Sequence, residues 1–259
     1  MSTAATAGES AWAETEGGRM RLILAGNDGN GIYEGALEIE PQPGWITYWR
    51  EPGDSGIPPQ ITVSPDSPLT LQSIAYPTPK RIDNGPVTDL AYDRPVSLPL
   101  TFQTDGKVDA AGKPLDLQVF IGLCKNICIP FQADFKLAVP AGSEPQDAIR
   151  IRMARQTLPA APSKDFSVAD VRRSDDGKAL LMDLALPGGS AEGLQLYVTG
   201  KPGMVYMTYN VEKTAGGLVS VRMPIAGLPL AGQPKAEAGT WRLLAIDGSR
   251  AMQTPLAFD

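Results

Sequence analysis

Cys124 and Cys128 are the residues of this sequence whose type and spacing are best suited to chemistry. They are the two cysteines of the 259-residue chain, and three residues separate them in CKNIC. A close pair of thiols can form a disulfide and exchange it with another protein. Used only as a staple, the bond would contribute little, because closing a five-residue loop stabilises a fold by about 2 kcal/mol. The pattern therefore predicts a reversible redox pair.

Other interpretations of the cysteine pair stay open. It could be a structural disulfide in a non-enzymatic β-sandwich docking module, or a Cu(I)-binding dithiolate, because two soft sulfurs suit that ion. The chain has no histidine, which excludes Ser-His-Asp and Cys-His catalysis and argues against His-ligated zinc or haem. We therefore expect no cofactor and no catalytic metal. Lys125, between the cysteines, is a nearby group able to favour a thiolate.

The overall composition limits the class of partner. The net charge is -6 and no long cluster of Lys or Arg occurs, whereas nucleic-acid binding depends on concentrated positive charge. No run approaches the ~18 to 20 apolar residues that span a bilayer, and the first twenty residues lack the basic start and apolar centre of a signal peptide. We expect a soluble, extracytoplasmic segment without its export signal, which acts on protein partners and does not insert into the membrane.

The elements that position the cysteines are predicted to be strands. Apolar and polar residues alternate over 115–121 and again over 131–139, and the short connection between these runs indicates a β-hairpin. In one extended strand, residues four apart would have Cα atoms about 13 Å apart, whereas a disulfide needs less than ~7 Å. We therefore expect both cysteines in a compact turn at the hairpin tip.

The rest of the chain repeats this alternation between turns that use its 24 prolines and 27 glycines. The pattern predicts an all-β protein with two β-sandwich domains joined by a short helical linker. Ser143 is a candidate helix cap, and Pro145 suits a first helical turn. The predicted boundaries are a flexible lead-in at 1–18, a redox-active β-sandwich at 19–141, the linker at 142–162 and a docking or structural β-sandwich at 163–259.

Four segments together resemble a known family: GLCKNICIPFQADFKL, GWITYWREPGDSGIPP, AYPTPKR and LPL. They are similar to the amino-terminal periplasmic domain of DsbD-type transmembrane thiol reductases, and most similar to its ScsB-like branch. The resemblance covers about residues 12–140 strongly and the second domain weakly. It implies immunoglobulin-like domains, thiol:disulfide oxidoreductase activity, and a periplasmic location as part of an inner-membrane protein.

The resemblance also implies partners and roles. Electrons would come from a membrane reductase through its thioredoxin-like domain and pass to a periplasmic thioredoxin-fold or peroxiredoxin acceptor, and the ScsB-like branch is associated with copper tolerance. By analogy, Cys128 forms the mixed disulfide with partners and Cys124 resolves it. The better-studied domains of the family place more residues between their two cysteines than this sequence does.

The family also implies a cover over the pair. A loop and nearby aromatic residues shield it until a partner docks, and residues 76–85 occupy the corresponding stretch here. The aromatic residues of GWITYWREPGDSG could line the active surface or belong to the core. The candidate cap and partner-docking residues are Tyr76, Ile82, Tyr48, Trp49, Lys125 and Pro130.

Overall fold

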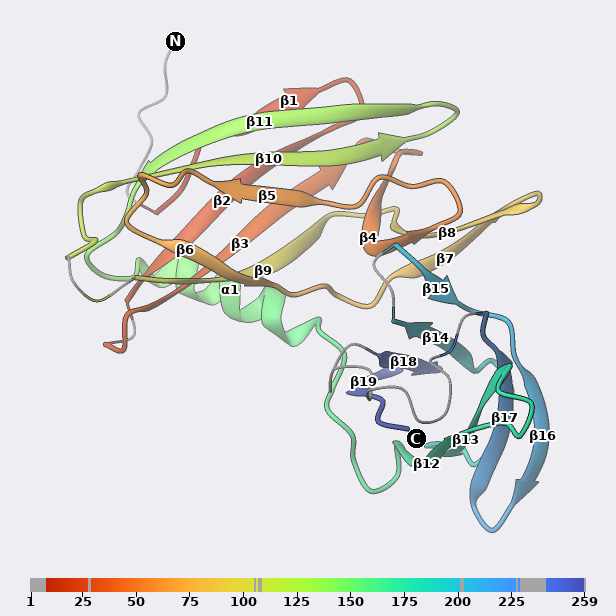
Figure 1. The fold of residues 1–259 in the computed structure, drawn as a ribbon. Coiled ribbons are helices and arrows are strands. Elements are labelled where there is room, and N and C mark those ends of the chain that lie inside the picture. Colours follow the sequence, from red (N-terminus) through yellow and green to blue (C-terminus); the bar gives the residue numbers. More distant parts are fainter. Residues whose placement is uncertain are drawn as a thin grey trace. The chain divides into compact units, whose positions relative to one another are not determined.

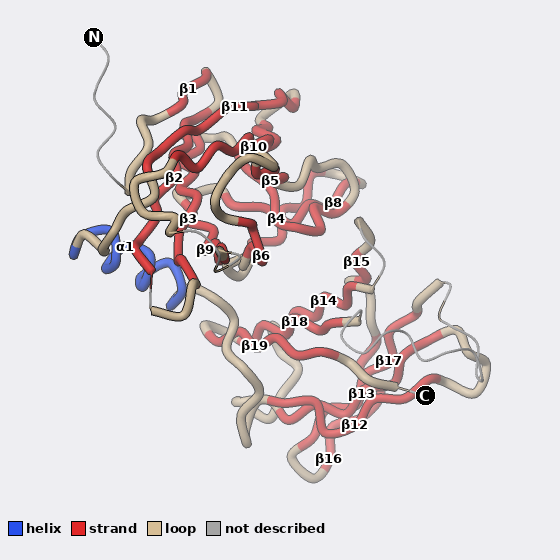
Figure 2. Tube along the Cα trace, turned by 60° about the vertical axis from the view of Figure 1, so that its left-hand side comes forward, coloured by secondary structure: helices blue, strands red, loops and turns tan. Residues whose placement is uncertain are grey.

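The chain forms two compact units, Met1–Leu158 and Pro159–Asp259. The computed structural model describes residues 8–27, 29–104, 106, 109–200, 203–226, 228 and 241–258. Strands dominate both units (Figures 1 and 2). Each unit is built from two antiparallel sheets, so the predicted all-β class with two immunoglobulin-like sandwiches is confirmed.

The first sheet of unit 1 has five strands in the order β1-β2-β3-β9-β6. Alternate residues of β2, such as Met20, Leu22 and Leu24, are almost fully buried and point into the core between the sheets. The strands are β1 (Ala13–Thr15), β2 (Gly18–Asn27), β3 (Ile32–Pro41), β9 (Val96–Gln103) and β6 (Thr70–Ile74).

The second sheet of unit 1 contains the cysteine hairpin. Its order is β11-β10-β4-β8-β7, with β5 also paired to β10. The β10–β11 ladder runs unbroken from the pair Pro114/Ala138 to the pair Cys124/Cys128, so the predicted hairpin is confirmed. The strands are β11 (Cys128–Ala138), β10 (Pro114–Cys124), β4 (Ile46–Gly53), β8 (Val87–Tyr92), β7 (Lys80–Asn84) and β5 (Gln60–Val63).

The helix α1 (Pro145–Gln156) packs on β2, β3 and β9 of unit 1 (Figure 1). The sequence placed it in a linker at 142–162, whereas the chain divides after Leu158 and the helix lies within the first unit. It does so because its buried residues Ile151 and Ala154 cover an apolar patch on the outer face of the five-stranded sheet.

The start of α1 differs from the expectation for Ser143. The N-cap residue is Glu144, which makes no side-chain cap hydrogen bond, and Pro145 opens the helix as predicted. Ser143 Oγ instead accepts a hydrogen bond from the Gly26 backbone N–H at 3.0 Å. The hydroxyl therefore ties the segment before the helix to β2, and the prediction that Ser143 caps the helix is wrong.

The segment before β2 is partly built into the first sheet. Residues 1–7 of the predicted flexible lead-in lie outside the described residues. From Gly8 onward the backbone pairs with β2: the Ser10 N–H donates to the Leu22 carbonyl at 2.9 Å, and β1 continues the sheet. The described part of the lead-in is thus an edge of the sandwich.

Unit 2 is a smaller sandwich of two four-stranded sheets, β12-β13-β17-β16 and β15-β14-β18-β19. Its own core includes Leu180, Met182 and Trp241. Within the described ranges, no helix combines the length and apolar character needed to cross a bilayer. The strands are β12 (Ser167–Arg173), β13 (Ala179–Ala185), β17 (Leu218–Pro224), β16 (Asn210–Ala215), β15 (Val205–Tyr206), β14 (Gln195–Thr199), β18 (Arg242–Asp247) and β19 (Arg250–Pro255).

Candidate functional site

The two cysteines form a disulfide at the tip of the β10–β11 hairpin. Cys124 is the last residue of β10 and Cys128 the first of β11, and their Cα atoms lie 4.1 Å apart. The Lys125 N–H donates to the Ile127 carbonyl at 3.2 Å, which closes the connecting turn. The ladder therefore places the two sulfurs directly opposite each other in a compact turn.

The two cysteines differ in their access to solvent. Cys124 is only 5% exposed and packs in a small cluster with Tyr48 and Ala91. Cys128 is exposed, and the preceding Ile127 is 70% exposed. A large reactant that approaches the hairpin tip therefore meets Cys128 before Cys124.

The pair lies on the outer face of its sheet, away from the core between the sheets. In the strand register, Cys124 is opposite Ile46 and Tyr48 is opposite Ala91, so these side chains share one face. Leu123 is fully buried on the other face. Both faces of the sheet are thus covered here, and a separate group of residues must cover the outer one.

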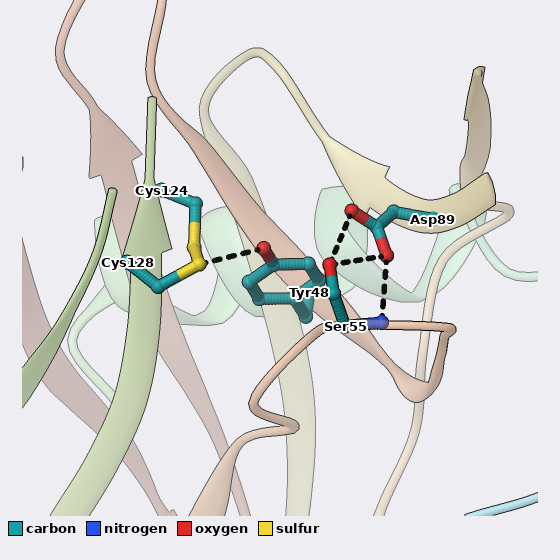
Figure 3. The surroundings of a disulfide bond; sticks show 5 residues. All are labelled: Tyr48, Ser55, Asp89, Cys124 and Cys128. Carbon is teal, nitrogen blue, oxygen red and sulfur yellow. Dashed lines mark hydrogen bonds between the residues drawn. A yellow bond between two sulfur atoms is a disulfide. The ribbon is translucent and has the colours of Figure 1, made fainter. Parts of the chain in front are cut away.

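Tyr48 connects this outer cluster to the sulfur of the exposed Cys128. Its Oη lies 3.3 Å from Cys128 Sγ (Figure 3), and its side chain is 1% exposed. Burial, reinforced by the nearby Asp89 carboxylate, raises the pKa of Tyr48 to about 12. The phenol is therefore protonated at neutral pH and donates its hydrogen to the sulfur.

Two glycines allow the Tyr48 ring to be packed on both sides. A Cβ added at Gly56 would lie 2.3 Å from Tyr48 Cδ1, and one added at Gly122 would lie 3.2 Å from Cδ2. The Gly122 Cβ would also lie 2.7 Å from the Cβ of Ile57. Residues 54–57, which we call the strap, therefore run across the ring and cover the outer face beside the disulfide.

The strap is held by the buried carboxylate of Asp89 on β8. Asp89 is 8% exposed and accepts hydrogen bonds from the Ser55 N–H at 3.2 Å and from Ser55 Oγ, which is 3.1 Å from each carboxylate oxygen. Figure 3 shows the Tyr48 ring between the disulfide and this Ser55–Asp89 pair. The sequence alone assigned neither Ser55 nor Asp89 to the site, because nothing local connects residues 34 positions apart.

The candidate cap residues occupy different surroundings. Ile82, on β7, packs against the cluster of Tyr48, Ala91 and Cys124. Burial and the nearby Glu51 carboxylate raise the pKa of Tyr76 to about 12, and Tyr76 in turn contributes to the raised pKa of Tyr92, which is caused mainly by burial. The structure thus places Ile82 beside the sulfur cluster and Tyr76 among residues of β4 and β8.

The remaining candidates lie around the hairpin or in the core. Lys125 is exposed, and a Cβ added at Gly44 would lie 3.4 Å from its Cε, so the lysine side chain extends over the turn before β4. Pro130 is exposed on the edge strand β11, where a residue without an N–H is tolerated. Trp49 is 1% exposed and faces away from Tyr48, because neighbours in a strand point to opposite faces.

The donor set for a metal is small. Over the part of the chain that the structure describes, no group of three or more His, Cys, Asp or Glu side chains is placed to hold a metal ion. The two sulfurs of the site are joined to each other. In this oxidised form the pair can accept electrons from an attacking thiolate, which is disulfide chemistry.

Comparison with known proteins adds to this geometry. Residues 29–140 match the family model described as "Thiol:disulfide interchange protein DsbD, N-terminal". This chain is also similar to the crystal structure of the N-terminal periplasmic domain of ScsB from Proteus mirabilis. The alignment covers 98% of this chain and 99% of the ScsB domain, with a TM-score of 0.75 and 19% sequence identity. That likeness shows a common fold across both units.

Two further comparisons are less informative. The alignment with the crystal structure of the periplasmic chaperone SfaE covers 92% of this chain and 100% of the chaperone chain, but the identity is 11% and the TM-score of 0.21 is too low to indicate a common fold. Comparison with curated protein sequences gave no match. The family match, in contrast, includes β4, β8 and the whole cysteine hairpin. Residues 29–140 of the first unit therefore match the family of amino-terminal domains of DsbD thiol:disulfide interchange proteins.

Proposed function

We propose that the first unit relays electrons by thiol-disulfide exchange, from the thioredoxin-like domain of a membrane reductase to disulfides of periplasmic proteins. The observation that carries this proposal is the unequal exposure of one disulfide: Cys128 is exposed at a hairpin tip and Cys124 is buried behind it. An inert staple has no need for one accessible sulfur. An exchange pair needs one sulfur that meets partners and one that resolves.

The delivery of electrons takes two displacement steps. In the reduced domain, the Cys128 thiolate attacks a sulfur of the acceptor disulfide, a Cys128–acceptor bond forms, and the other acceptor sulfur leaves as a thiolate. The Cys124 thiolate then attacks Cys128 Sγ, closes the intramolecular disulfide and releases the second acceptor thiolate. Two electrons have passed to the acceptor, whose two thiolates take up protons from solvent.

Reduction of the domain follows the same path in reverse. A thiolate of the thioredoxin-like donor attacks the exposed Cys128 Sγ, and Cys124 leaves as a thiolate. The second donor thiolate then attacks the donor sulfur of this mixed disulfide, and Cys128 leaves as a thiolate while the donor becomes oxidised. Cys128 therefore carries negative charge both when it attacks an acceptor and when it leaves a donor.

Tyr48 is suited to stabilise that charge. Its hydroxyl is 3.3 Å from Cys128 Sγ in the oxidised form, and a hydrogen bond to a thiolate is stronger than one to a neutral sulfur. Stabilising the thiolate favours both the attack and the departure of Cys128 at neutral pH. Lys125, in the same turn, is a candidate for an additional positive charge.

The surroundings of Cys128 suit a partner with an apolar surface beside its own cysteine. Ile127 is 70% exposed, and Pro130 is exposed two residues after Cys128. Ile82 packs on the buried side of the pair and acts as a cap that a docked partner displaces.

The similarity to the DsbD and ScsB domains supports three broader assignments. We propose a periplasmic location within an inner-membrane protein, a role in copper tolerance, and a docking or structural role for unit 2.

Matched serine variants test the exchange function. The Cys124→Ser chain, produced in the periplasm, should accumulate dithiothreitol-sensitive mixed disulfides through Cys128, visible on non-reducing gels. The Cys128→Ser chain should accumulate far fewer, because its remaining thiol is buried. Equal absence of adducts in both variants would contradict the proposal.

The reduction potential separates exchange from stapling. An exchange pair should equilibrate with glutathione, whereas a potential far below about -300 mV would identify a structural disulfide. The measurement uses the unmodified chain in glutathione buffers, with the oxidised fraction read by mass after thiol alkylation. Tight one-to-one binding of Cu(I) by the reduced chain would instead support a copper-binding dithiolate.

A further inference from the structure

The strap is attached to the rest of unit 1 mainly by β8. The Gly53 backbone is paired with Asp89, the Asp54 N–H donates to the Thr88 carbonyl at 3.1 Å, and the Thr88 N–H donates to Asp54 Oδ2 at 2.8 Å. The next contact along the strap is Ser55 with the Asp89 carboxylate. Gly56 and Ile57 then follow across Tyr48 and Gly122.

The Asp89 carboxylate is an unusual choice for a merely structural contact. Burying a charged group costs free energy unless hydrogen bonds or an opposite charge compensate it, and Asp89 is 8% exposed. Over the described part of the chain, Ser55 supplies the donors to this carboxylate: its backbone N–H, and its hydroxyl, whose single hydrogen is shared between the two oxygens. The carboxylate thus fixes one point of the strap through both the backbone and the side chain of the serine.

Asp89 also lies where the strap meets strand β7, which carries Ile82 and which we call the cap strand. Its backbone is opposite Ile82 on β7 and opposite Gly53 at the end of β4. Ile82 packs on the cluster that contains Tyr48. A single residue of β8 therefore anchors the strap through its side chain and the cap strand through its backbone.

We propose that Asp89 is a positioning residue for the exchange reaction: through Ser55 its carboxylate holds the strap over Tyr48, and the strap holds the Tyr48 hydroxyl at Cys128 Sγ. The inference rests on the proposed exchange function for its biological meaning. Charged groups on the segments that form this site include Asp89 on β8, Asp54 on the strap and Lys125 in the hairpin turn. Release of the Ser55 contact frees the ring, and the thiolate loses its hydrogen-bond donor.

The test measures the reactivity of Cys128 without any protein partner. In the Cys124→Ser chain, alkylation of Cys128 by iodoacetamide is followed across pH. The half-maximal pH reports stabilisation of the thiolate, and the plateau rate at high pH reports access to the sulfur. Tyr48→Phe should move the profile to higher pH and slow alkylation at neutral pH about tenfold, because a hydrogen bond to a charged group is lost.

The positioning role predicts a specific pattern among the strap variants. Ser55→Ala and Asp89→Ala should move the profile in the same direction as Tyr48→Phe, whereas Asp89→Asn should retain most of the native profile because its amide oxygen still accepts from Ser55. Asp134→Asn, at an exposed position of β11 six residues from Cys128, is the control and should leave the profile unchanged.

A double-mutant cycle decides whether Asp89 acts through Tyr48. In the Tyr48→Phe background, Asp89→Ala should cause no further shift of the profile. Additive shifts, or an unchanged profile in Ser55→Ala, would overturn the inference. Ser55→Ala removes a single hydroxyl and keeps the test valid if Asp89→Ala does not fold. The alkylation assay uses no protein partner, so a negative result in it would overturn the role of Asp89 without deciding the exchange function, which the trapping experiment tests separately.

Discussion

The two outer faces of the first sandwich are covered in different ways. On the five-stranded sheet, the twelve-residue helix α1 buries Ile151 and Ala154 against Ile23, and Arg150 is paired with Glu9 and Glu38. On the six-stranded sheet, the four-residue strap lies across Tyr48 and is held at Ser55 by Asp89.

The difference separates a permanent cover from one that can be adjusted. The helix buries two apolar side chains on the sheet and forms ion pairs with Glu9 and Glu38, so opening it would expose apolar surface and break several contacts at once. A short segment held by a few hydrogen bonds to one carboxylate opens at a much smaller free-energy cost. The sulfur pair lies beside the weaker cover, where its surroundings can change without unfolding the sandwich.

Ile151→Ala should cause the largest loss of stability, because it empties the space under the permanent cover. Ile151 is 1% exposed on the sheet-facing side of helix α1, and removing a buried isoleucine side chain to alanine costs about 2 to 5 kcal/mol. Denaturant unfolding measures this loss. The pH profile of Cys128 alkylation should stay native, since the helix covers the opposite sheet; a shifted profile would show that the two covers are coupled.

Gly56→Ala should disturb the strap while costing less stability. Its new Cβ would overlap the Tyr48 ring, and such overpacking typically costs about 1 to 3 kcal/mol. The ring or the strap must move, so the alkylation profile of Cys128 should shift to higher pH, as measured with iodoacetamide.

Gly142→Ala is the matched control for that substitution. A Cβ at Gly142 meets no atom within 4 Å, and neither glycine has a positive φ. The control should therefore leave both the unfolding free energy and the alkylation profile close to native. Equal effects of the two substitutions would mean that Gly56 is not needed for the close packing of Tyr48.

Ile82→Ala should have a smaller effect, confined to access. Ile82 is partly buried against the sulfur cluster, so its truncation should cost about 1 kcal/mol or less of stability. The rate at which dithiothreitol reduces the disulfide should rise about two- to threefold because less side chain covers the pair. A slower reduction would contradict the role of Ile82 as a cap.

The smallest effect is expected at Asp147, a buried carboxylate in the first turn of helix α1. Burial, with a contribution from Glu9, raises the pKa of Asp147 above its ordinary value, against the opposing effect of Arg150. The folded state therefore binds a proton more readily than the unfolded state, and the ionised carboxylate costs stability at neutral pH.

Asp147→Asn should consequently raise the melting temperature slightly at pH 7. The advantage should shrink as the pH falls through the raised folded pKa and disappear near the unfolded value of 3.8. Parallel melting curves of the variant and the native chain between about pH 7 and pH 4 check this. A difference that grows on acidification would have the wrong sign.

The local sequence pattern was sufficient to predict the hairpin and the position of both cysteines at its tip. The strands on either side of the tip alternate apolar and polar residues along their length, and such alternation reports a half-buried strand without any knowledge of its neighbours. The helix at Pro145 was likewise visible from a local signal. These features depend on residues close together in the sequence, which is why they could be predicted.

The cover over the disulfide could not be predicted in the same way. Tyr48 and Trp49 lie in a strand that is buried on both faces, so its composition does not distinguish the core side from the sulfur side. The contact of Ser55 with Asp89 depends on the bulge between Tyr48 and Gly53 in the β4–β8 pairing. Such contacts follow from the register of separate strands and leave no local signal.

The β10–β11 ladder also governs how long the pair stays bound to another thiol. Because backbone pairing along both strands holds the Cα atoms of Cys124 and Cys128 4.1 Å apart, Cys124 remains beside Cys128 after the bond between them is broken. Such a neighbour acts at a high effective concentration, which favours the intramolecular reaction over any competing thiol in solution. Covalent complexes with partners should therefore be short-lived, and turnover should be set by the frequency of encounters.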